Sequence, residues 1–457
     1  MQIEVYNISE IPQICSFSNI HNAKIYYIRV NCMKKYTEMT KEELEREKKL
    51  TEAEDLDIKA KNYSLDMSRG KPSNDQLGLT ESLLHILNKG ADCKTEDGID
   101  CRNYGQLFGL KEARVLFSDL LGIPADNIIL GGNSSLNMMY DTVARAMLYG
   151  VPGSDKPWCK QEHIKFLCPS PGYDRHFHIC ESLGIEMIPV DMTPDGPDMD
   201  AVERLVSEDE SIKGIWCVPK YSNPQGITYS DETVKRFARL DCKAKDFRIF
   251  WDNAYAVHDL DDHGDKLMNI FSLMHGTKYE DQLYYFFSTS KISFPGSGVA
   301  LLALSDRNLA ATTKIIEAAT IGPDKINQLR HVRYFTNAEG IIDHMRLHGM
   351  VLKPKFDVVL DTLEKELKPT GIADWTRPKG GYFISLDVAD DTAKETYRLA
   401  SEAGVKITKA GATFPYGKDP RDRNLRLAPS YPPLDELAAA IHVICVCAKL
   451  AYLNKIS

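Results

Sequence analysis

Between about residues 110 and 305 the chain alternates short apolar runs with segments of helical pattern. The apolar runs lie at about 127–130, 164–168, 185–190, 212–218, 247–251, 283–287 and 299–304. Runs of this length with few charges and several aromatic residues are typical of buried strands. Strands separated by helical segments need crossover connections, which favour a mainly parallel sheet covered by helices on both faces. The sequence therefore predicts an α/β fold.

Beyond about residue 330 the pattern changes, and a smaller α+β unit is expected. Residues 382–386 and 425–427 are typical of strands, and 434–450 is expected to form an amphipathic helix. We divide the chain into an N-terminal extension, a helical segment that contributes to the small domain, a large ligand-binding domain and the small C-terminal domain. Their expected bounds are 1–32, 33–100, 101–330 and 331–457.

Composition excludes several classes of protein. The net charge of the 457 residues is −9, which argues against a general nucleic-acid binder and against an anionic membrane surface. No apolar run approaches the ~20 residues of a membrane span. The eleven cysteines include no C-x-x-C pair, and Cys445 and Cys447 lack a nearby third metal ligand. We expect a reduced, cytoplasmic protein without a metal site.

Residues 1–32 show no helical period and no basic start followed by a clean apolar stretch, so they do not resemble a signal peptide. A charged helical pattern begins at Lys41, shortly after Met33. One hypothesis is that translation starts at Met33; the alternative is a short native extension. A peptide from residues 1–32, found by mass spectrometry of the natural protein, would exclude the first.

Two strand ends carry residues suited to chemistry. Lys291 follows the run 283–287 within Ser-Thr-Ser-Lys, and Asp252 follows the run 247–251. Ligands of open α/β sheets bind beyond the carboxyl ends of the strands. A lysine that bonds to an aldehyde and an aspartate that pairs with a pyridinium nitrogen are what pyridoxal phosphate requires.

Other residues at predicted strand ends have a functional and a structural interpretation. Asn133 and Ser134 follow two glycines at a strand-to-helix junction, where free N–H groups bind phosphate but where turns and caps also occur. Tyr173 either stacks on a flat ring or packs in the core. The Asn-Pro-Gln-Gly segment at 223–226 is either a plain β-turn or part of a site.

Three further residues have the same ambiguity. Asp252 is either a cofactor ligand or a cap of the segment after it, and Tyr255 is either functional or a core tyrosine. Arg426 lies in an apolar setting, where arginine needs a partner. That partner is either a substrate carboxylate, which its planar fork suits, or a structural ion pair.

Taken in this order, the motifs resemble the fold-type I pyridoxal-phosphate enzymes, and among them the class I aminotransferases. The matching motifs are Asn-Pro-x-Gly, Asp-x-x-Tyr, Ser-x-x-Lys and the late arginine, and the resemblance covers about residues 60–450. The segments at 67–72, 103–105, 131–136 and 289–296 look like those of the bacterial subgroup Ic of aspartate aminotransferases.

The resemblance implies a role for each matching residue. Lys291 holds pyridoxal 5'-phosphate and later moves a proton, Asp252 keeps the pyridine nitrogen protonated, and Tyr255 and Asn223 hydrogen-bond the phenolic oxygen. The other implied roles are ring stacking by Tyr173, phosphate binding by Gly132, Asn133, Ser134, Ser288 and the neighbouring subunit's copy of Tyr104, and substrate carboxylate binding by Arg426 next to Gly70. A homodimer with shared sites follows.

Two features depart from this pattern. Many family members have a phosphate-binding arginine eight positions after the lysine, where this chain has Val299. The cation that would bind the second carboxylate of a dicarboxylic substrate is not fixed by any motif. The candidates by position are Arg69, Lys71, Arg175 and Lys220.

The expected activity is transfer of an amino group from an amino acid, aspartate or glutamate, to a 2-oxo acid. An aromatic or broad-range aminotransferase and a lyase on the same scaffold are the alternatives. A transcriptional regulator with an aminotransferase-like domain is a remote alternative, because residues 1–60 are too short for a DNA-binding domain and lack a helix-turn-helix pattern.

Overall fold

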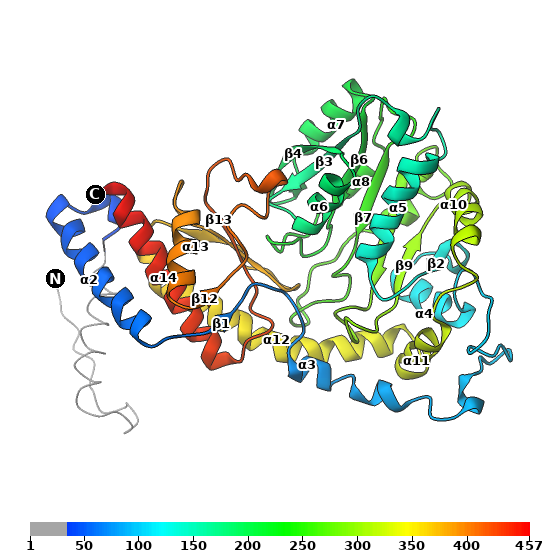
Figure 1. The fold of residues 1–457 in the computed structure, drawn as a ribbon, viewed down its shortest axis with the longest axis horizontal. Helices are drawn as coiled ribbons and strands as arrows, with labels where there is room; N and C mark the ends of the chain where they lie inside the picture. Colours follow the sequence, from blue (N-terminus) through cyan, green and yellow to red (C-terminus); the bar gives the residue numbers. More distant parts are fainter. Residues whose placement is uncertain (1–33) are drawn as a thin grey trace.

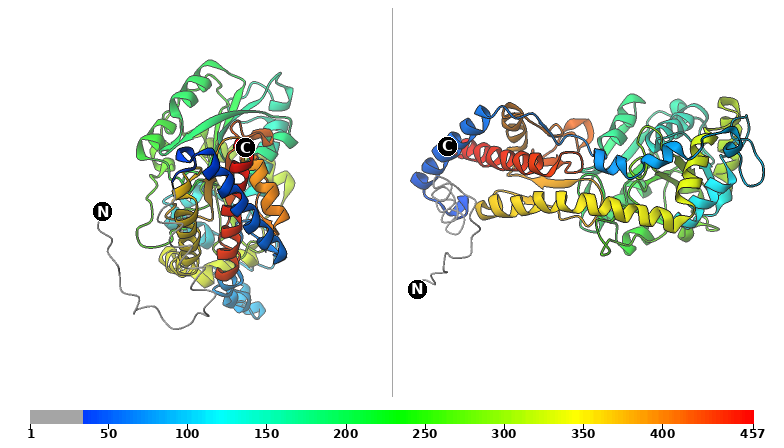
Figure 2. Two further views of the ribbon diagram at one scale, coloured as in Figure 1. Left: turned by 90° about the vertical axis from the view of Figure 1, so that its left-hand side faces the viewer. Right: turned by 90° about the horizontal axis from the view of Figure 1, so that it is seen from below.

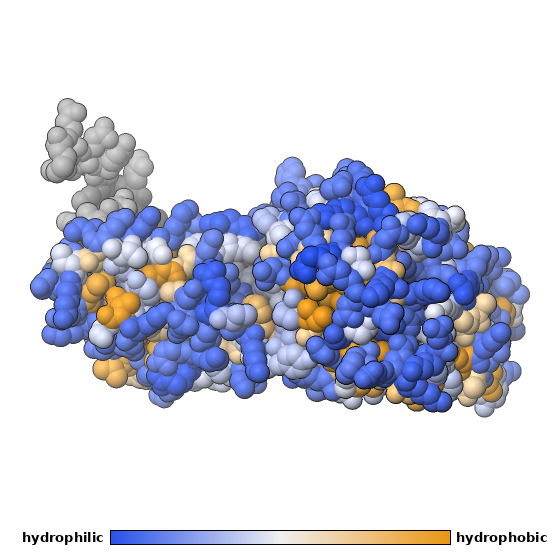
Figure 3. Space-filling view, turned by 90° about the horizontal axis from the view of Figure 1, so that it is seen from above, coloured by the Kyte–Doolittle hydropathy of each residue, from blue (hydrophilic) through white to orange (hydrophobic). Residues whose placement is uncertain are grey.

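The computed structural model describes residues 34–457, so the predictions for residues 1–32 and for a start at Met33 lie outside the described part. The molecule is elongated, with a large sheet-containing part and a narrower part that carries the C-terminus (Figure 1). The long helix α12 (Ala338–Glu366) runs from one part to the other, as Figure 2 shows from below. Hydrophilic side chains cover most of the face seen in Figure 3, with apolar patches scattered among them.

The large part contains an eight-stranded sheet with the order β2-β9-β8-β7-β6-β3-β4-β5. β8, β7, β6, β3 and β4 are parallel, whereas β9 is antiparallel to β8 and β2, and β5 is antiparallel to β4. The mainly parallel sheet predicted from the apolar runs is therefore confirmed. Its strands are β2 (Ile128–Leu130), β3 (Lys165–Ser170), β4 (Glu186–Thr193), β5 (Gly196–Pro197), β6 (Ile212–Cys217), β7 (Arg248–Asp252), β8 (Leu283–Ser288) and β9 (Ala300–Ala303).

Helices cover both faces of this sheet, and each face has its own apolar cluster. Neighbouring residues of β7 show the alternation, since Phe250 packs in one cluster and Trp251 in the other. This arrangement accounts for the continuous apolarity of the strands. The helices of this part are α4 (Lys111–Leu121), α5 (Ser135–Tyr149), α6 (Asp174–Ser182), α7 (Met199–Glu208), α8 (Asp231–Phe237), α9 (Ile270–Met274), α10 (Asp306–Ala319) and α11 (Lys325–Phe335).

The narrower part has two small sheets and a helical layer. β11 (Ile384–Asp387) pairs antiparallel with β10 (Asp374–Trp375) and with β13 (Asn424–Leu427). β1 (Leu65–Asp66) pairs with β12 (Val405–Lys406), which brings an early segment against the C-terminal region. The remaining helices are α2 (Lys41–Ala60), α3 (Asn74–Gly78), α13 (Ala393–Glu402) and α14 (Leu434–Ile456).

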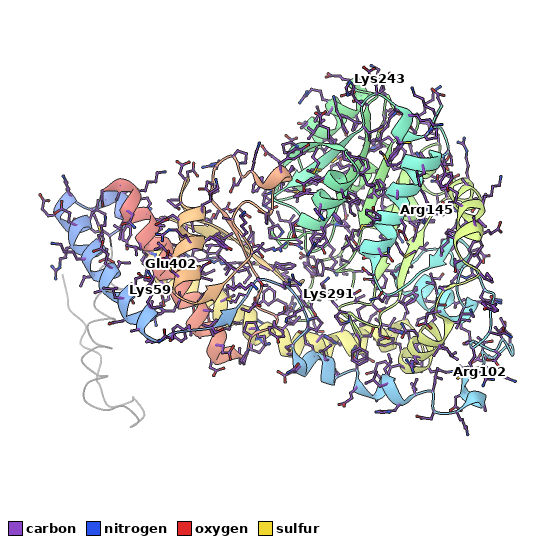
Figure 4. All side chains as sticks on the ribbon, in the orientation of Figure 1. Lys59, Arg102, Arg145, Lys243, Lys291 and Glu402 are labelled. Atoms are coloured by element: carbon purple, nitrogen blue, oxygen red, sulfur yellow. The ribbon has the colours of Figure 1, made fainter. Side chains whose placement is uncertain are left out.

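Helix α2 begins where the charge pattern predicted it. The Thr40 side chain accepts a hydrogen bond from the Glu43 N–H, and the Glu43 carboxylate accepts one from the Thr40 N–H. This capping box satisfies two of the N–H groups that a helix start leaves unpaired. The helix packs on α14, and its Lys59 forms an ion pair of 3.4 Å with Glu402 of α13 (Figure 4).

The prediction of an amphipathic helix at 434–450 was wrong. Helix α14 is long and apolar enough to cross a membrane by length and composition, and 72% of its most apolar 18-residue window is buried inside the protein. It packs against α2, α12 and α13. A helix that is apolar all round needs burial on all sides, and these three neighbours provide it, so we interpret α14 as a core helix.

The predicted boundary between the large and small domains at residue 330 stays a prediction. Phe335, Ile341 and Met345 belong to an apolar cluster of the large part, whereas Leu352 and Phe356 belong to that of the narrower part. The N-terminal half of α12 thus packs in the core of the large part, and a later stretch of the same helix packs in the core of the narrower part.

Candidate active site

A cavity of about 720 Å³ opens between the strand ends of the large sheet and the narrower part. Lys291 lies where these two parts meet (Figure 4). The structure brings ten of the sequence-predicted residues to this cavity. They are Gly70, Asn133, Ser134, Tyr173, Asn223, Asp252, Tyr255, Ser288, Lys291 and Arg426.

Asp252 is the last residue of β7 and is buried at the bottom of the site. Its Oδ2 lies 3.2 Å from Nε2 of His176, whereas its Oδ1 is buried without a hydrogen-bond partner among residues 34–457. The His176 ring is stacked on Trp216, with centroids 4.4 Å apart. An unpaired buried carboxylate oxygen is costly, and it matches the N–H of a protonated pyridine ring.

Sequence reasoning missed His176. It lies three residues after Tyr173, one turn along the start of α6, and their rings meet edge to face at 4.9 Å. A polar residue at that spacing from a candidate ring-stacking tyrosine was the available signal.

Lys291 lies in a tight turn directly after β8. The backbone N–H groups of Ile292 and Ser293 both donate to the Thr289 carbonyl at 2.9 Å, which closes the turn. Burial lowers the pKa of the Lys291 amine, and the Asp252 carboxylate opposes that shift. A lowered pKa favours the neutral amine, which is the nucleophilic form.

Two aromatic rings face the amine. Lys291 Nζ is 5.0 Å from the centroid of the Tyr255 ring and 5.8 Å from that of Tyr382. Burial raises the pKa of the Tyr255 phenol well above its ordinary value, and burial next to Asp252 raises the pKa of Tyr173 to about 12. Both phenols therefore keep their protons at neutral pH and can donate hydrogen bonds.

Arg426 on β13 is buried and has several partners. Its Nη1 lies 2.7 Å from Asp174 Oδ1 and 3.2 Å from Asn223 Oδ1, and its guanidinium stacks on the Phe383 ring at 5.0 Å. The structural ion pair considered for Arg426 thus exists, and the same guanidinium also lines the cavity. A Cβ at Gly70 would approach Phe383 Cζ to 2.5 Å, so a glycine there leaves room for the stacked pair.

The candidate phosphate end lies at the start of α5. Ser134 is the N-cap residue and its side chain makes no capping bond, while Ser290 Oγ donates to the Asn133 carbonyl at 2.9 Å. Helix N-termini bind anions through free N–H groups and the helix dipole. Val299 is buried, as its apolar setting predicted, and its N–H donates to Thr289 Oγ1 at 2.8 Å.

Three sequence candidates do not line the cavity. Gly132 lies beside Asn133, and its carbonyl accepts a hydrogen bond from the Ala300 N–H at 2.8 Å. Tyr104 is 82% exposed and is not among the residues that line this chain's own cavity. Lys220 forms an ion pair of 2.8 Å with Asp259.

The set of candidate cations for a second carboxylate therefore loses Lys220 and gains two lysines. Arg69, Lys71 and Arg175 line the cavity mouth, and the structure adds Lys406 and Lys409, which the sequence did not suggest. All five are exposed.

Comparison with known proteins places the chain in a family. The family model described as aspartate amino-transferase matches residues 39–457. An aspartate aminotransferase of Corynebacterium glutamicum is 46% identical over 395 residues, which are 86% of this chain and 91% of that protein. The crystal structure of an aspartate transaminase from the same species has a TM-score of 0.90 at 43% identity and covers 93% of this chain and 99% of its own.

A more distant structure shares the fold alone. The aspartate aminotransferase of Thermus thermophilus with maleate has a TM-score of 0.64 at 16% identity, over 92% of this chain and 98% of that one. The chain belongs to the aspartate aminotransferase family of fold-type I enzymes. It is an aminotransferase, as the ordered motifs predicted.

Proposed function

We propose that this aminotransferase binds pyridoxal 5'-phosphate in the cavity and moves an amino group from aspartate or glutamate to a 2-oxo acid. The observation that carries the proposal is that one cavity holds a partly buried lysine amine, that of Lys291, and a buried carboxylate with one free oxygen, that of Asp252. The similarity to the aspartate aminotransferase of C. glutamicum supports the choice of substrate.

The residues of the site fit this cofactor. When bound, pyridoxal phosphate supplies an aldehyde that accepts the amino group and a ring that takes up electrons from the substrate Cα. Lys291 holds the aldehyde end and carries the proton at Nζ. Asp252 Oδ1 would accept a hydrogen bond from the pyridine N–H, and its charge would keep that proton in place.

The other residues orient the two molecules. Tyr255 and Asn223 would hydrogen-bond the phenolic oxygen, Tyr173 would stack on the ring, and Arg426 would bind the substrate α-carboxylate next to Gly70. The phosphate would be held by Asn133, Ser134 and Ser288, with Tyr104 from a second subunit. The exposure of Tyr104 supports a homodimer with shared sites.

The charge at the cavity mouth supports a dicarboxylic substrate. Five cationic side chains lie there, and the one carboxylate at the mouth, that of Asp174, is already paired with Arg426. Among residues 34–457, Arg69 and Arg175 form no ion pair at all. A cluster of one sign attracts ligands of the other sign and weakens as salt screens it. We expect kcat/KM for aspartate to fall steeply with added salt, whereas that for phenylalanine stays nearly constant.

A half-reaction screen tests the function. Each amino acid is added alone to the purified holoenzyme, and conversion of the bound cofactor is followed by its visible absorbance. We expect aspartate and glutamate to convert it, and Lys291→Ala to lose the covalently held cofactor. Preferred conversion by aromatic amino acids, or release of ammonia and a 2-oxo acid without an acceptor, would replace this proposal by one of its alternatives.

A further inference from the structure

Three buried histidines lie beneath the turn that carries Lys291. They are His331 on α11 and His344 and His348 on α12, with 0%, 6% and 1% of their surface exposed. None of the three is among the residues that line the cavity. Their hydrogen bonds lead to the Lys291 turn.

His331 ties the two ends of the turn to α11. Its Nδ1 lies 2.8 Å from the Asn327 carbonyl oxygen. Because a carbonyl oxygen only accepts, Nδ1 carries the proton and Nε2 is left as an acceptor. That Nε2 lies 2.7 Å from Ser293 Oγ and 3.2 Å from Thr289 Oγ1. The hydroxyls on both sides of the lysine are thus held by one neutral ring.

His344 and His348 hold the middle of the turn. His344 Nε2 lies 2.9 Å from the Ile292 carbonyl oxygen, so this nitrogen carries the proton and donates. His348, one turn further along α12, accepts at Nδ1 a hydrogen bond from the Gln76 side-chain amide at 3.1 Å, and its Nε2 lies 3.1 Å from His344 Nε2. One neutral donor, His344, therefore holds the carbonyl of the residue that follows Lys291, and His348 lies directly against that donor.

Neutrality distinguishes these histidines from other donors. Burial lowers the pKa of His331 to about 4 and that of His348 to about 3, and it also lowers the pKa of His344. All three are uncharged at neutral pH, so they fix the backbone without placing a positive charge near the Lys291 amine. An arginine or lysine in their place would add such a charge.

We propose that His331, His344 and His348 are positioning residues that hold the Lys291 turn and thereby fix the direction of its amine into the cavity. The inference rests on Lys291 being the cofactor lysine, as proposed above. A displacement of about 1 Å at a reacting group lowers the rate by up to about a hundredfold. Residues that fix the Lys291 turn would therefore increase the rate of the reaction.

The test compares two substitutions of one histidine. His344→Leu removes the donor to Ile292, whereas His344→Gln places an amide N–H near the same point. The first measurement uses the cofactor-free protein: the rate at which acetic anhydride labels Lys291 is followed against pH by mass spectrometry of its peptide. The second measurement is the separation of kcat from KM in the holoenzyme.

In His344→Leu we expect the amine to gain access to water, so that the midpoint of labelling rises by about one pH unit. We also expect kcat to fall about tenfold with KM within about twofold. His344→Gln should keep both properties near those of the unchanged protein. Folded Leu and Gln variants with the same labelling midpoint and the same kcat would overturn the proposal.

Two further variants separate positioning from stability. His442→Leu removes a partly buried histidine on α14, far from the turn, and should lower stability without moving the labelling of Lys291. If His344→Leu does not fold, Ser293→Ala removes the 2.7 Å link to His331 at little change in volume and should shift the labelling in the same direction. An equal shift in His442→Leu, or no shift in Ser293→Ala, contradicts the positioning role. If Lys291→Ala keeps its covalently held cofactor, the proposed function fails, while the labelling still reports on the turn.

Discussion

Asp174 and Arg426 form a 2.7 Å ion pair inside the cavity that contains Lys291. The arginine proposed to bind the substrate carboxylate thus already has a carboxylate on it. The Asp174 side chain is 31% exposed, so it can turn toward water when a substrate arrives. Substrate binding at Arg426 is then an exchange of one carboxylate for another.

Asp174→Asn removes this competitor while keeping a side chain of the same size. A partly exposed ion pair contributes about 1 kcal/mol, so we expect KM for aspartate to fall roughly fivefold with kcat almost unchanged. Steady-state kinetics against aspartate check this, with Asp195→Asn, a surface change outside the cavity, as the control. A rise in KM would mean that Asp174 holds Arg426 in its binding position instead of competing for it.

His176→Phe tests the support of Asp252. The substitution keeps an aromatic ring on Trp216 but leaves Asp252 Oδ2 without the partner that lies at 3.2 Å. A hydrogen bond to a charged group contributes about 1.5–3 kcal/mol, and its loss favours the protonated carboxyl, which binds a pyridinium poorly. We expect the Kd of the cofactor to rise about 10- to 100-fold, as measured by fluorescence titration of the cofactor-free protein. His178→Phe, on the exposed side of α6, should leave the Kd unchanged.

The sequence predicts those site residues whose placement follows from nearby residues in the chain, and it misses those placed by residues distant in the chain. Lys291 and Asp252 stand out in the sequence because each follows its own apolar strand, and neighbouring parallel strands bring their ends together. His176 lies 76 residues before Asp252, and their contact depends on the strand order β3-β6-β7, which no local pattern specifies.

The same limit applies to the helices. The start of α2 follows from its capping box, which is local. The surroundings of α14 are set by α2, α12 and α13, which are distant in sequence. The few polar residues of α14 suggested a solvated face, but Lys449 is buried near Glu366 of α12. Tertiary packing, rather than the periodicity of apolar residues, determines which faces of such a helix are buried.

The His442 cluster makes stability depend on pH. His442 Nδ1 lies 3.0 Å from Glu366 and its Nε2 3.6 Å from Glu54. The hydrogen bond to Glu366 raises the pKa of His442 above its unfolded value of ~6.5. A raised pKa means that the folded protein binds the proton more tightly, so this contribution is complete below pH ~6.5 and is lost as the pH rises through the folded pKa.

We therefore expect the difference in the free energy of unfolding in urea between the unchanged protein and His442→Gln to decrease from pH 6 to pH 8.5. Taking this difference removes the contributions of His331, His344 and His348, whose lowered pKa values act in the opposite direction. The side chain is about one-third exposed, which reduces the size of the effect. A pH dependence that is the same in His442→Gln would assign it to other groups.

The environment of Lys291 predicts how the cofactor-free protein takes up pyridoxal phosphate. Only the neutral amine attacks the aldehyde, and burial lowers its pKa from the ordinary value of ~10.4. The rate of covalent loading should thus reach half of its maximum below the ordinary lysine value of ~10.4. Asp252 opposes the shift, since its negative charge favours the protonated amine. In Asp252→Asn the midpoint should move to lower pH, even though the loaded variant is nearly inactive. Stopped-flow absorbance from pH 6 to pH 10 measures both midpoints, and an upward shift in Asp252→Asn would show that the carboxylate does not act on the amine through its charge.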